Sequence, residues 1–520
     1  MLRSVLVVVG MLCLAGPIAA ADEVYDVVVY GGTPGGVTTA VAAAREGAKV
    51  LVLEQMRHVG GLNTSGLNNS EVMHMHEWTF SGISGEFYAR LAKAYGRTGL
   101  MHRWESSVAQ KVFDTMLAEA RVPVRYQQRV VKVEKDGPRI RRIVMQDGTA
   151  VAGKTFVDCS YEGDLMARAG VSYTWGREGR DQYGEPLAGV RLGDPNIKAR
   201  TRDANGNLLP GISDTLENLQ PGAGDKKVQN YNFRLTLVKD KANKVPFSQP
   251  RNYAPERYAL LANYLKQYPN KQFKDLVAYW PIVPGKYEAN NHQCAIISLG
   301  HFGGQLEYPD ADYATQDCIY QDHVDYTQGF FWFLLNDPRV PAPIRAQTAE
   351  WGLAKDEFVD NGNWPYYLYI REGRRMIGPY VMTQKDLQTD RKKPDSIGLG
   401  SHYIDAHHVQ RVAVSADEFT NEGRLWTPGK VYEIPYRAIT PKADQCENML
   451  VPVAASFSHV AFCAFRLEPT WMTAGHAAGV AAALAAREGV PVQQVQIENL
   501  QERLTAGKQL LWLKEGDEGN

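Results

Sequence analysis

With 520 residues, the chain is too long for one small domain and long enough to bury a substantial core. Hydrophobic residues make up 44% and charged residues 22%, as in an ordinary globular protein. The 57 lysine and arginine residues nearly balance the 58 aspartate and glutamate residues, which gives no reason to expect a nucleic acid or an anionic membrane as partner.

Residues 1–21 have the pattern of an export signal. Arg3 precedes the apolar stretch SVLVVVGMLCLAG, which is too short to span a bilayer comfortably, and small residues then allow cleavage after about Ala20 or Ala21. The alternative is a buried first strand, but the strand-like run YDVVVYGG follows at once and fits that role better. We therefore expect a periplasmic or secreted protein, with no membrane span further along the chain.

Five cysteines remain after the leader, an odd and sparse set that does not indicate a disulfide scaffold. Cys294 and Cys318 either pair in an oxidising compartment or stay as free thiols, and the sequence leaves both open.

The next segment predicts a nucleotide-binding βαβ unit. Val27–Tyr30 is a continuous apolar run, typical of a parallel strand that is buried on both faces. A glycine-rich turn, an alanine-rich helical stretch and a second apolar run ending in Glu54 follow. The side-chain-free turn allows a pyrophosphate to approach the first turn of the helix, where N–H groups and the helix dipole attract it. The predicted turn residues are Gly31, Gly32, Thr33, Pro34, Gly35 and Gly36.

This turn departs from the G-x-G-x-x-G fingerprint at one position. Gly31 and Gly36 match its first and last glycines, whereas Thr33 stands at the middle one and offers a hydroxyl to the phosphate. Glu54 lies 23 residues after Gly31, where an acid accepts the ribose hydroxyls and disfavours the 2′-phosphate of NADP.

A second glycine pair begins six residues after Glu54, in the stretch EQMRHVGGLNTSG. In this spacing the chain resembles the flavoproteins with two dinucleotide-binding domains, in which such a segment runs along FAD. The resemblance implies FAD as cofactor, with contacts from Gly60, Gly61, Leu62, Thr64 and Ser65.

More narrowly, the chain resembles the secreted FAD-dependent oxidoreductases of bacteria that degrade complex organic matter. The resemblance covers nearly the whole mature chain and rests on segments such as 156–178, 231–237, 364–386, 395–411, 434–440 and 458–485. It implies that Val130 and Val131 pass the adenine. It also implies that the helix containing Gly475, Ala477 and Ala478 points its positive end at the flavin, although a buried helix without flavin contact is the alternative.

We expect an α/β fold: a Rossmann-like FAD-binding domain with a parallel sheet and a β-meander, plus an inserted α+β substrate or cap domain. The strands of the meander are VVKVEK and RRIVMQ, joined at a DG turn. The predicted organisation is a signal peptide (1–21), the first part of the FAD domain (22–180), the cap domain (181–435), the second part of the FAD domain (436–508) and a polar tail (509–520).

Four residues of the inserted segment are candidates for catalysis. His402 and His407 lie in SHYIDAHHVQR, where one histidine would act as general base with Asp405 orienting its ring. Arg374 and Arg375 lie in REGRRMIG and suit a substrate carboxylate or the FAD phosphates. Structural hydrogen bonds and salt bridges are the alternative for all four.

Other side chains give weaker signals. His74 and His76 alternate as a strand pair would, but no further ligand is near and we predict no metal site. His58 is a position for covalent flavin attachment. The aromatic run from Trp364 to Tyr369 would stack on sugar rings, or belong to the core.

The sequence thus predicts an exported FAD-dependent oxidoreductase that takes a hydride from a C–H bond of a small polar substrate such as an alcohol, an amine or a sugar. The export signal and the family resemblance imply that this substrate is carbohydrate-derived. The electron acceptor and the oligomeric state stay open. The alternatives are an FAD-fold binding protein without turnover, and an FAD-dependent isomerase or lyase without net redox chemistry.

Overall fold

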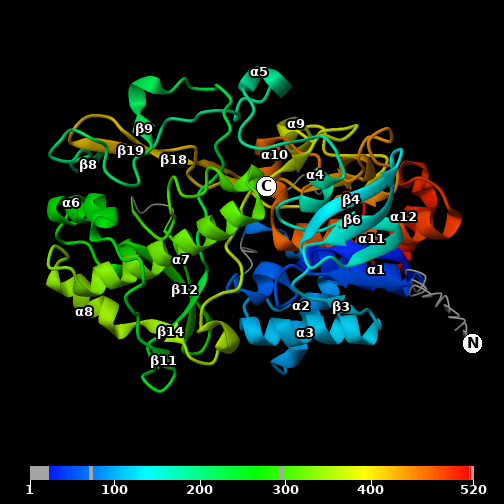
Figure 1. The fold of residues 1–520 in the computed structure, drawn as a ribbon, viewed down its shortest axis with the longest axis horizontal. Helices are drawn as coiled ribbons and strands as arrows, with labels where there is room; N and C mark the ends of the chain where they lie inside the picture. Colours follow the sequence, from blue (N-terminus) through cyan, green and yellow to red (C-terminus); the bar gives the residue numbers. More distant parts are fainter. Residues whose placement is uncertain (1–22, 70–73, 293–296, 515, 517–520) are drawn as a thin grey trace, which may run out of the picture.

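A computed structural model describes residues 23–69, 74–292, 297–514 and 516 (Figure 1). The predicted βαβ unit is present as β1 (Val24–Tyr30), α1 (Pro34–Arg45) and β2 (Val50–Leu53). β1 and β2 pair in parallel, with Val27 opposite Val50 and Tyr30 opposite Leu53. The predicted leader, residues 1–21, and Cys294 lie outside the described residues.

The parallel sheet has the order β3-β2-β1-β6-β22. β3 (Val124–Arg125) pairs with β2, β6 (Ala150–Asp158) pairs with β1, and β22 (Met449–Leu450) pairs with the second half of β6. Successive residues of β1 alternate between two hydrophobic clusters, because Val27 and Val29 face the helices whereas Val28 and Tyr30 face the meander. Burial on both faces explains the continuous apolar run in the sequence.

The predicted β-meander is confirmed. β4 (Val130–Asp136) and β5 (Arg139–Met145) form an antiparallel hairpin, and β5 continues antiparallel onto the first half of β6. Helix α4 (Asp164–Arg168) packs against β4 and β6.

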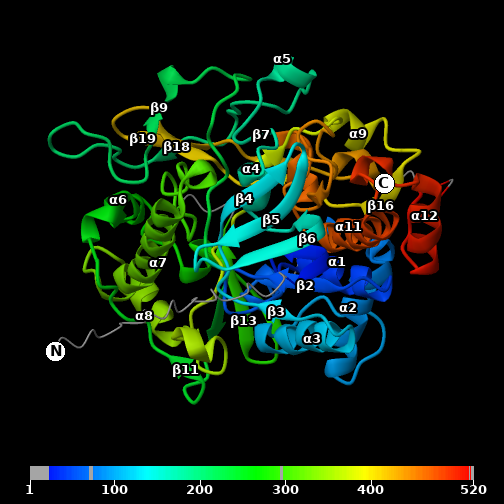
Figure 2. The ribbon, with the colours of Figure 1, turned by 45° about the vertical axis from the view of Figure 1, so that its right-hand side comes forward.

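The opposite face of the parallel sheet is covered by helices from both ends of the chain. α1 lies against α11 (Glu468–Glu488), as Figure 2 shows. Small residues allow this approach, because a Cβ on Gly475 would overlap the Gly35 carbonyl and a Cβ on Gly479 would overlap the Thr39 carbonyl. The helices around them are α2 (Gly82–Ala94), α3 (Ser106–Glu119), α10 (His459–Phe465) and α12 (Ile497–Ala506).

The inserted region is α+β, as predicted, and its five-stranded sheet with helices α6 (Ala259–Gln267), α7 (Tyr313–Asn336) and α8 (Ala342–Glu350) lies in the left half of Figure 1. This antiparallel sheet has the order β11 (Lys244–Val245), β14 (Gly352–Ala354), β10 (Leu235–Val238), β13 (Lys286–Asn291) and β12 (Val277–Val283). A second sheet contains β8 (Ile197–Lys198), β19 (Glu418–Glu422), β18 (Gln410–Ala413) and β9 (Asp214–Thr215).

Short elements tie this region to the rest of the molecule. β7 (Tyr173–Thr174) pairs with β15 (Arg375–Met376), and β16 (Ser396–Gly400) pairs with β21 (Tyr432–Pro435). β16 also packs against α11, so the segment 181–435 contributes to both halves. The remaining elements are α5 (Arg180–Tyr183), α9 (Gln384–Gln388), β17 (Ile404–Ala406) and β20 (Leu425–Thr427).

The predicted polar tail from residue 509 needs a correction. Gln509 is buried and donates from Nε2 to the carbonyls of Ile397 and Thr473, and Leu511 is 1% exposed. The Leu511 carbonyl also accepts from the Ser396 hydroxyl at 2.5 Å. The beginning of this segment is therefore docked against β16 and α11, because its apolar and amide side chains find partners there.

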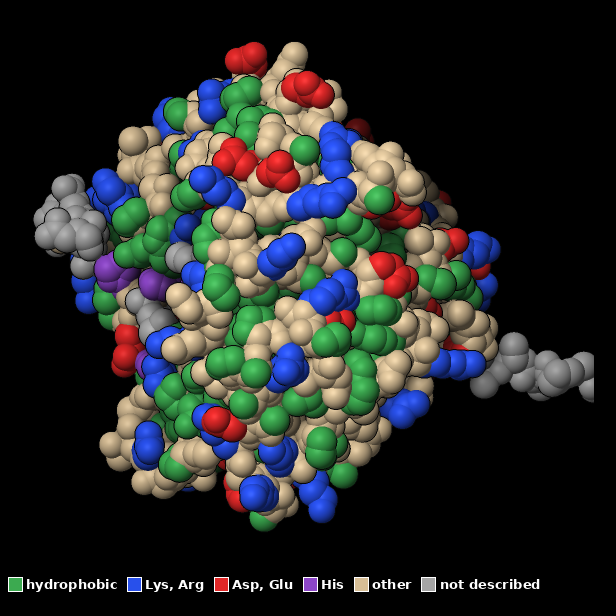
Figure 3. Space-filling view, turned by 90° about the vertical axis from the view of Figure 1, so that its left-hand side faces the viewer, with side chains coloured by type: hydrophobic (Ala, Val, Ile, Leu, Met, Phe, Trp, Pro, Cys, Tyr) green, Lys and Arg blue, Asp and Glu red, His purple; other side chains and the backbone are tan. Residues whose placement is uncertain are grey.

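Acidic and basic side chains are interspersed on the face drawn in Figure 3. In the described part of the chain, no helix combines the length and the apolar character that crossing a membrane requires.

Candidate cofactor and active site

The turn between β1 and α1 is closed so tightly that glycine is required. Gly31 has φ +95°, and a Cβ there would lie 2.6 Å from the Ser160 nitrogen and 2.7 Å from the Cys159 carbonyl carbon. Pro34 begins the helix, and Thr33 caps it by accepting from the Gly36 N–H at 3.2 Å. The Thr33 hydroxyl donates to the Cys159 carbonyl at 2.8 Å, so it serves the turn itself and does not fit the predicted role as a donor to phosphate.

Glu54 lies beside this turn, as its spacing predicts. Its Oε2 accepts from the Gly32 N–H at 2.5 Å and its Oε1 accepts from the Met56 N–H at 2.6 Å. The Tyr367 hydroxyl also donates to Oε1. Burial raises the pKa of Glu54, and these donors oppose that rise. The carboxylate thus has a fixed orientation at the carboxyl end of β2.

The segment from Gly60 follows the same edge of the sheet. Gly60 has φ +92° and precedes a short 3₁₀ turn, Gly61–Thr64. The Thr64 hydroxyl donates to the Val59 carbonyl at 2.8 Å, and the Ser65 hydroxyl accepts from the Tyr367 N–H at 2.7 Å. The side chain of Leu62 is fully buried. These hydrogen bonds and the buried Leu62 side chain therefore hold the segment in one conformation.

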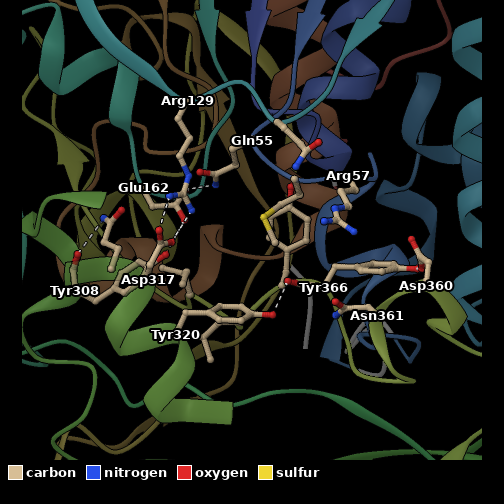
Figure 4. Close-up of a pocket in the computed structure, with 16 residues that line it drawn as sticks. Gln55, Arg57, Arg129, Glu162, Tyr308, Asp317, Tyr320, Asp360, Asn361 and Tyr366 are labelled. Carbon is tan, nitrogen blue, oxygen red and sulfur yellow. Dashed lines mark hydrogen bonds and ion pairs between the residues drawn. The ribbon is translucent and has the colours of Figure 1, made fainter. Parts of the chain in front are cut away.

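A cavity of about 300 Å³ opens next to Glu54 (Figure 4). Gln55 and Arg57 line it from the β2 side, and α7 covers it with Asp317 and Tyr320. Arg129 forms an ion pair with Asp317 at 2.7 Å, which ties α7 to the meander. The position of this cavity suits the adenosine half of a dinucleotide.

The two valines predicted at the adenine are placed differently from one another. Val130 is buried, its N–H donates to the Tyr30 hydroxyl at 3.3 Å and its carbonyl accepts from the Tyr313 hydroxyl at 3.0 Å. Val131 is 46% exposed, so its side chain does not face the buried site.

Helix α11 begins at Glu468, about two to three turns before the residues predicted to meet the flavin. Gly475 packs on α1, and the side chains of Ala477 and Ala478 are fully buried. These three positions therefore give close helix packing and lie away from the positive end of the helix, which is a correction to the prediction.

Buried polar groups without partners lie in the first turn of α11 and in the segment from Gly60. Among the described residues, no hydrogen-bond partner is present for Glu468 Oε2, the Thr470 hydroxyl, the Trp471 Nε1 or either side-chain atom of Asn63. Burying such groups without partners is costly, so they mark a place where a polar ligand completes the structure. Together with the glycine turn and Glu54, these residues fit FAD.

A polar cluster lies beyond this segment, on the side of the inserted region. Arg234, Arg371 and Arg466 are all buried and converge on Tyr369, whose hydroxyl accepts from Arg466 at 2.9 Å. Because a Cβ on Gly66 would overlap the Arg234 carbonyl, the cluster touches the predicted flavin segment directly.

His407 belongs to this cluster. Its Nδ1 accepts from the Asn291 amide at 3.1 Å, and its Nε2 lies 4.0 Å from Asp405. Burial and then the charges of Arg371 and Arg466 lower the pKa of His407 well below its usual value. The imidazole is therefore neutral at physiological pH, and because Nδ1 accepts from Asn291 its proton lies on Nε2.

The other predicted histidines have separate surroundings. His402 is buried and its Nδ1 contacts the Tyr403 carbonyl at 2.8 Å. His74 packs on His402, Tyr403 and Trp426. His58 pairs with Asp360 at 2.7 Å and stacks on Tyr366.

Arg374 and Arg375 are engaged in ion pairs within the protein. Arg374 contacts Asp164 and Asp310, each at 3.1 Å. Arg375, fully buried, contacts Glu178 at 2.6 Å and also Glu372. These contacts give both guanidinium groups a structural role in place of the predicted catalytic one, because the neighbouring acids satisfy them.

We expect Arg375→Leu to lower the free energy of unfolding by about 3–5 kcal/mol, because Glu178 and Glu372 would remain buried without their cation. Urea unfolding followed by fluorescence measures this loss. The matched control is Arg141→Ala, whose pair with Asp136 is exposed and should contribute less than about 1 kcal/mol. Equal losses in the two variants would contradict the structural role.

One set of described residues has the composition of a metal site: Glu372, His459 and Cys463. The imidazole of His459 contacts both Glu372 oxygens at 2.9 Å, and Arg375 contacts the same carboxylate. A guanidinium next to the carboxylate opposes a cation there, so the cluster is better explained as an ion-pair network.

Several site residues were not predicted from the sequence. Tyr161 bonds to Leu62 in the predicted flavin segment, and Tyr313 and Tyr320 reach the cavity region from α7. The aromatic run from Trp364 to Tyr369 is largely core rather than a sugar platform, since Trp364 is 6% exposed. Only Tyr161 carried a signal, because it follows the carboxyl end of the parallel strand β6.

A family model described as "FAD dependent oxidoreductase" matches residues 26–504. No curated protein sequence matches the chain. Among solved structures, the Diels-Alderase PyrE3 of pyrroindomycin biosynthesis is 14% identical, with 51% of this chain and 45% of that chain covered and a TM-score of 0.25.

Two further solved structures are similar at the same level. OxyS anhydrotetracycline hydroxylase from Streptomyces rimosus is 14% identical, with 51% and 44% covered and a TM-score of 0.25. NikD, an amino acid oxidase of nikkomycin biosynthesis, is 15% identical, with 36% and 61% covered and a TM-score of 0.23. The chain thus spans less than two thirds of the length of each of these proteins.

Proposed function

The chain belongs to the FAD-dependent oxidoreductase family, and on that premise we propose that it takes a hydride from a C–H bond of a small polar substrate held beside His407. The observation that carries this proposal is a neutral, buried histidine in a polar cluster that touches the flavin segment at Gly66. Such a group suits proton transfer next to a redox cofactor.

The cofactor would be held by the residues that border its predicted path. The N–H groups of the β1–α1 turn would bind the pyrophosphate, Glu54 would accept from the ribose hydroxyls, and the cavity under α7 would receive the adenosine. Bound FAD supplies the acceptor for the hydride.

His407 would accept at Nδ1, in exchange for the Asn291 hydrogen bond, the proton that leaves a substrate hydroxyl or amine while the adjacent C–H bond gives up its hydride. That hydride would pass with its two electrons to the bound flavin, and the imidazole would hold the proton. Asp405, 4.0 Å from Nε2, favours the protonated ring that forms. The Asn291 amide, which bonds to both Arg371 and His407, fixes the ring orientation.

We also propose that the substrate is carbohydrate-derived and that the protein works outside the cytoplasm. The support is the leader-like pattern of residues 1–21 and the family resemblance. N-terminal sequencing of protein secreted by a host expressing the full chain tests export, with a mature N-terminus near Asp22 as the expected result.

The decisive measurement is the visible spectrum of the purified protein, before and after acid precipitation. We expect flavin absorption in the native protein, and bleaching when a screen of alcohols, amines and sugars reaches the substrate. A protein that stays colourless after incubation with FAD would overturn the proposed function.

A further inference from the structure

Glu468 links three segments at the predicted flavin site. Its side chain is 1% exposed, and its Oε1 accepts from the Tyr161 hydroxyl at 2.6 Å. The same hydroxyl accepts from the Leu62 N–H at 3.0 Å. The start of α11, the end of β6 and the flavin segment therefore meet at one carboxyl group.

Burial favours the neutral form of the Glu468 carboxyl group. Burial raises the pKa of Glu468 to about 8, against the smaller opposing effect of the Tyr161 hydroxyl. Because Oε1 already accepts from Tyr161, the proton is placed on Oε2, which has no partner among the described residues. The group is thus a buried donor that needs an acceptor.

Other buried polar groups without partners indicate that this acceptor is the flavin ring and not the pyrophosphate. Asn63 follows Leu62 directly, is fully buried, and has both its amide nitrogen and its amide oxygen unused. The amide oxygen requires a donor, which a pyrophosphate lacks and the pyrimidine edge of a flavin offers beside its carbonyl acceptors. The Thr470 hydroxyl, also without a partner, lies in the first turn of α11.

We propose that Glu468 is a neutral carboxylic acid that donates from Oε2 to the pyrimidine edge of the flavin and so favours the reduced cofactor. This inference rests on FAD binding at the site described above. A neutral donor and the positive end of α11 both stabilise negative charge on the ring, whereas an ionised Glu468 would oppose it.

The test compares wild type with Glu468→Gln and Glu468→Met by spectroscopic redox titration between pH 6 and 9.5. Above about pH 8 the carboxyl group of the wild type should ionise. The preference of the wild-type protein for reduced over oxidised FAD should then fall about tenfold relative to that of Glu468→Gln. A tenfold change corresponds to about 30 mV for a two-electron couple. Because glutamine keeps a neutral donor, the reduction potential of FAD bound to Glu468→Gln should follow that of the wild type below pH 8.

FAD affinity gives a second readout that does not depend on turnover. At pH 7, Glu468→Met should bind FAD about tenfold more weakly because one hydrogen bond is lost, while Glu468→Gln stays near wild type. Tyr161→Phe removes a bond that lowers the pKa of Glu468 and should move the redox transition to higher pH. Asp114→Asn is the matched control, since this carboxyl on α3 also has a raised pKa but contacts Gln110.

The proposal would be overturned if wild type, Glu468→Gln and Glu468→Met had the same FAD affinity and the same FAD reduction potential between pH 6 and 9.5. Equal weakening of ADP and FAD binding in Glu468→Met would place the acceptor on the pyrophosphate and overturn the assignment to the flavin. Failure of the wild type to bind FAD would be a different result, because it would also overturn the proposed function.

Discussion

Replacing Gly31 with alanine is expected to weaken FAD binding by at least about a thousandfold, because strain and overlap act on the same residue. Its φ of +95° already disfavours a side chain, and the added Cβ would lie within 2.7 Å of backbone atoms of Cys159 and Ser160. The turn would have to move away from β6, and the N–H groups that face the pyrophosphate would move with it. Equilibrium dialysis of the apoprotein against FAD measures the change.

Gly47→Ala is the matched control. Gly47 has φ +86°, but a Cβ added there would have no atom within 4 Å, so this substitution carries the backbone strain without the overlap. It should cost about 1 kcal/mol of stability and leave FAD affinity unchanged. Comparable loss of FAD in both variants would show that strain in the fold, and not the shape of the turn, controls binding.

His407→Ala is expected to slow substrate-dependent flavin reduction by a factor of about 100–10,000 while FAD stays bound, as for loss of a general base. Stopped-flow absorbance with the substrate found in the screen measures the rate. Added imidazole should restore part of it. His102→Ala, which removes a partly exposed histidine paired with Glu77, should behave like wild type.

The pH profile of the same reaction gives an independent check. An ordinary histidine is half protonated near pH 6.5. Because burial and three neighbouring guanidinium groups lower the pKa of His407, the neutral base persists on acidification and the acidic limb of the wild-type profile should lie well below that of an ordinary histidine. A limb centred near pH 6.5, or an unaltered rate in His407→Ala, would exclude this residue as the base.

The corrections to the sequence-based predictions have a common cause. Arg374 and Arg375 looked available for an anion, yet packing of residues 160–180 against 372–375 brings acids onto both. Thr33 looked like a phosphate ligand, yet β6 presents the Cys159 carbonyl to its hydroxyl. In each case the deciding partner is distant in sequence, and the residue type alone does not identify it.

The sequence by itself determined the βαβ unit, its glycine turn, Glu54, the meander and the return of the chain to the parallel sheet. Strand, turn and helix signals are contiguous, and hydrophobic periodicity reports burial locally. Only the tertiary structure decided that α7 covers the cavity next to Glu54, that Tyr161 joins Glu468 to Leu62, and that residues 234, 371, 407 and 466 form one cluster. These contacts join segments that lie far apart along the chain, and their geometry arises from the packing of two sheets and their helices rather than from any local pattern.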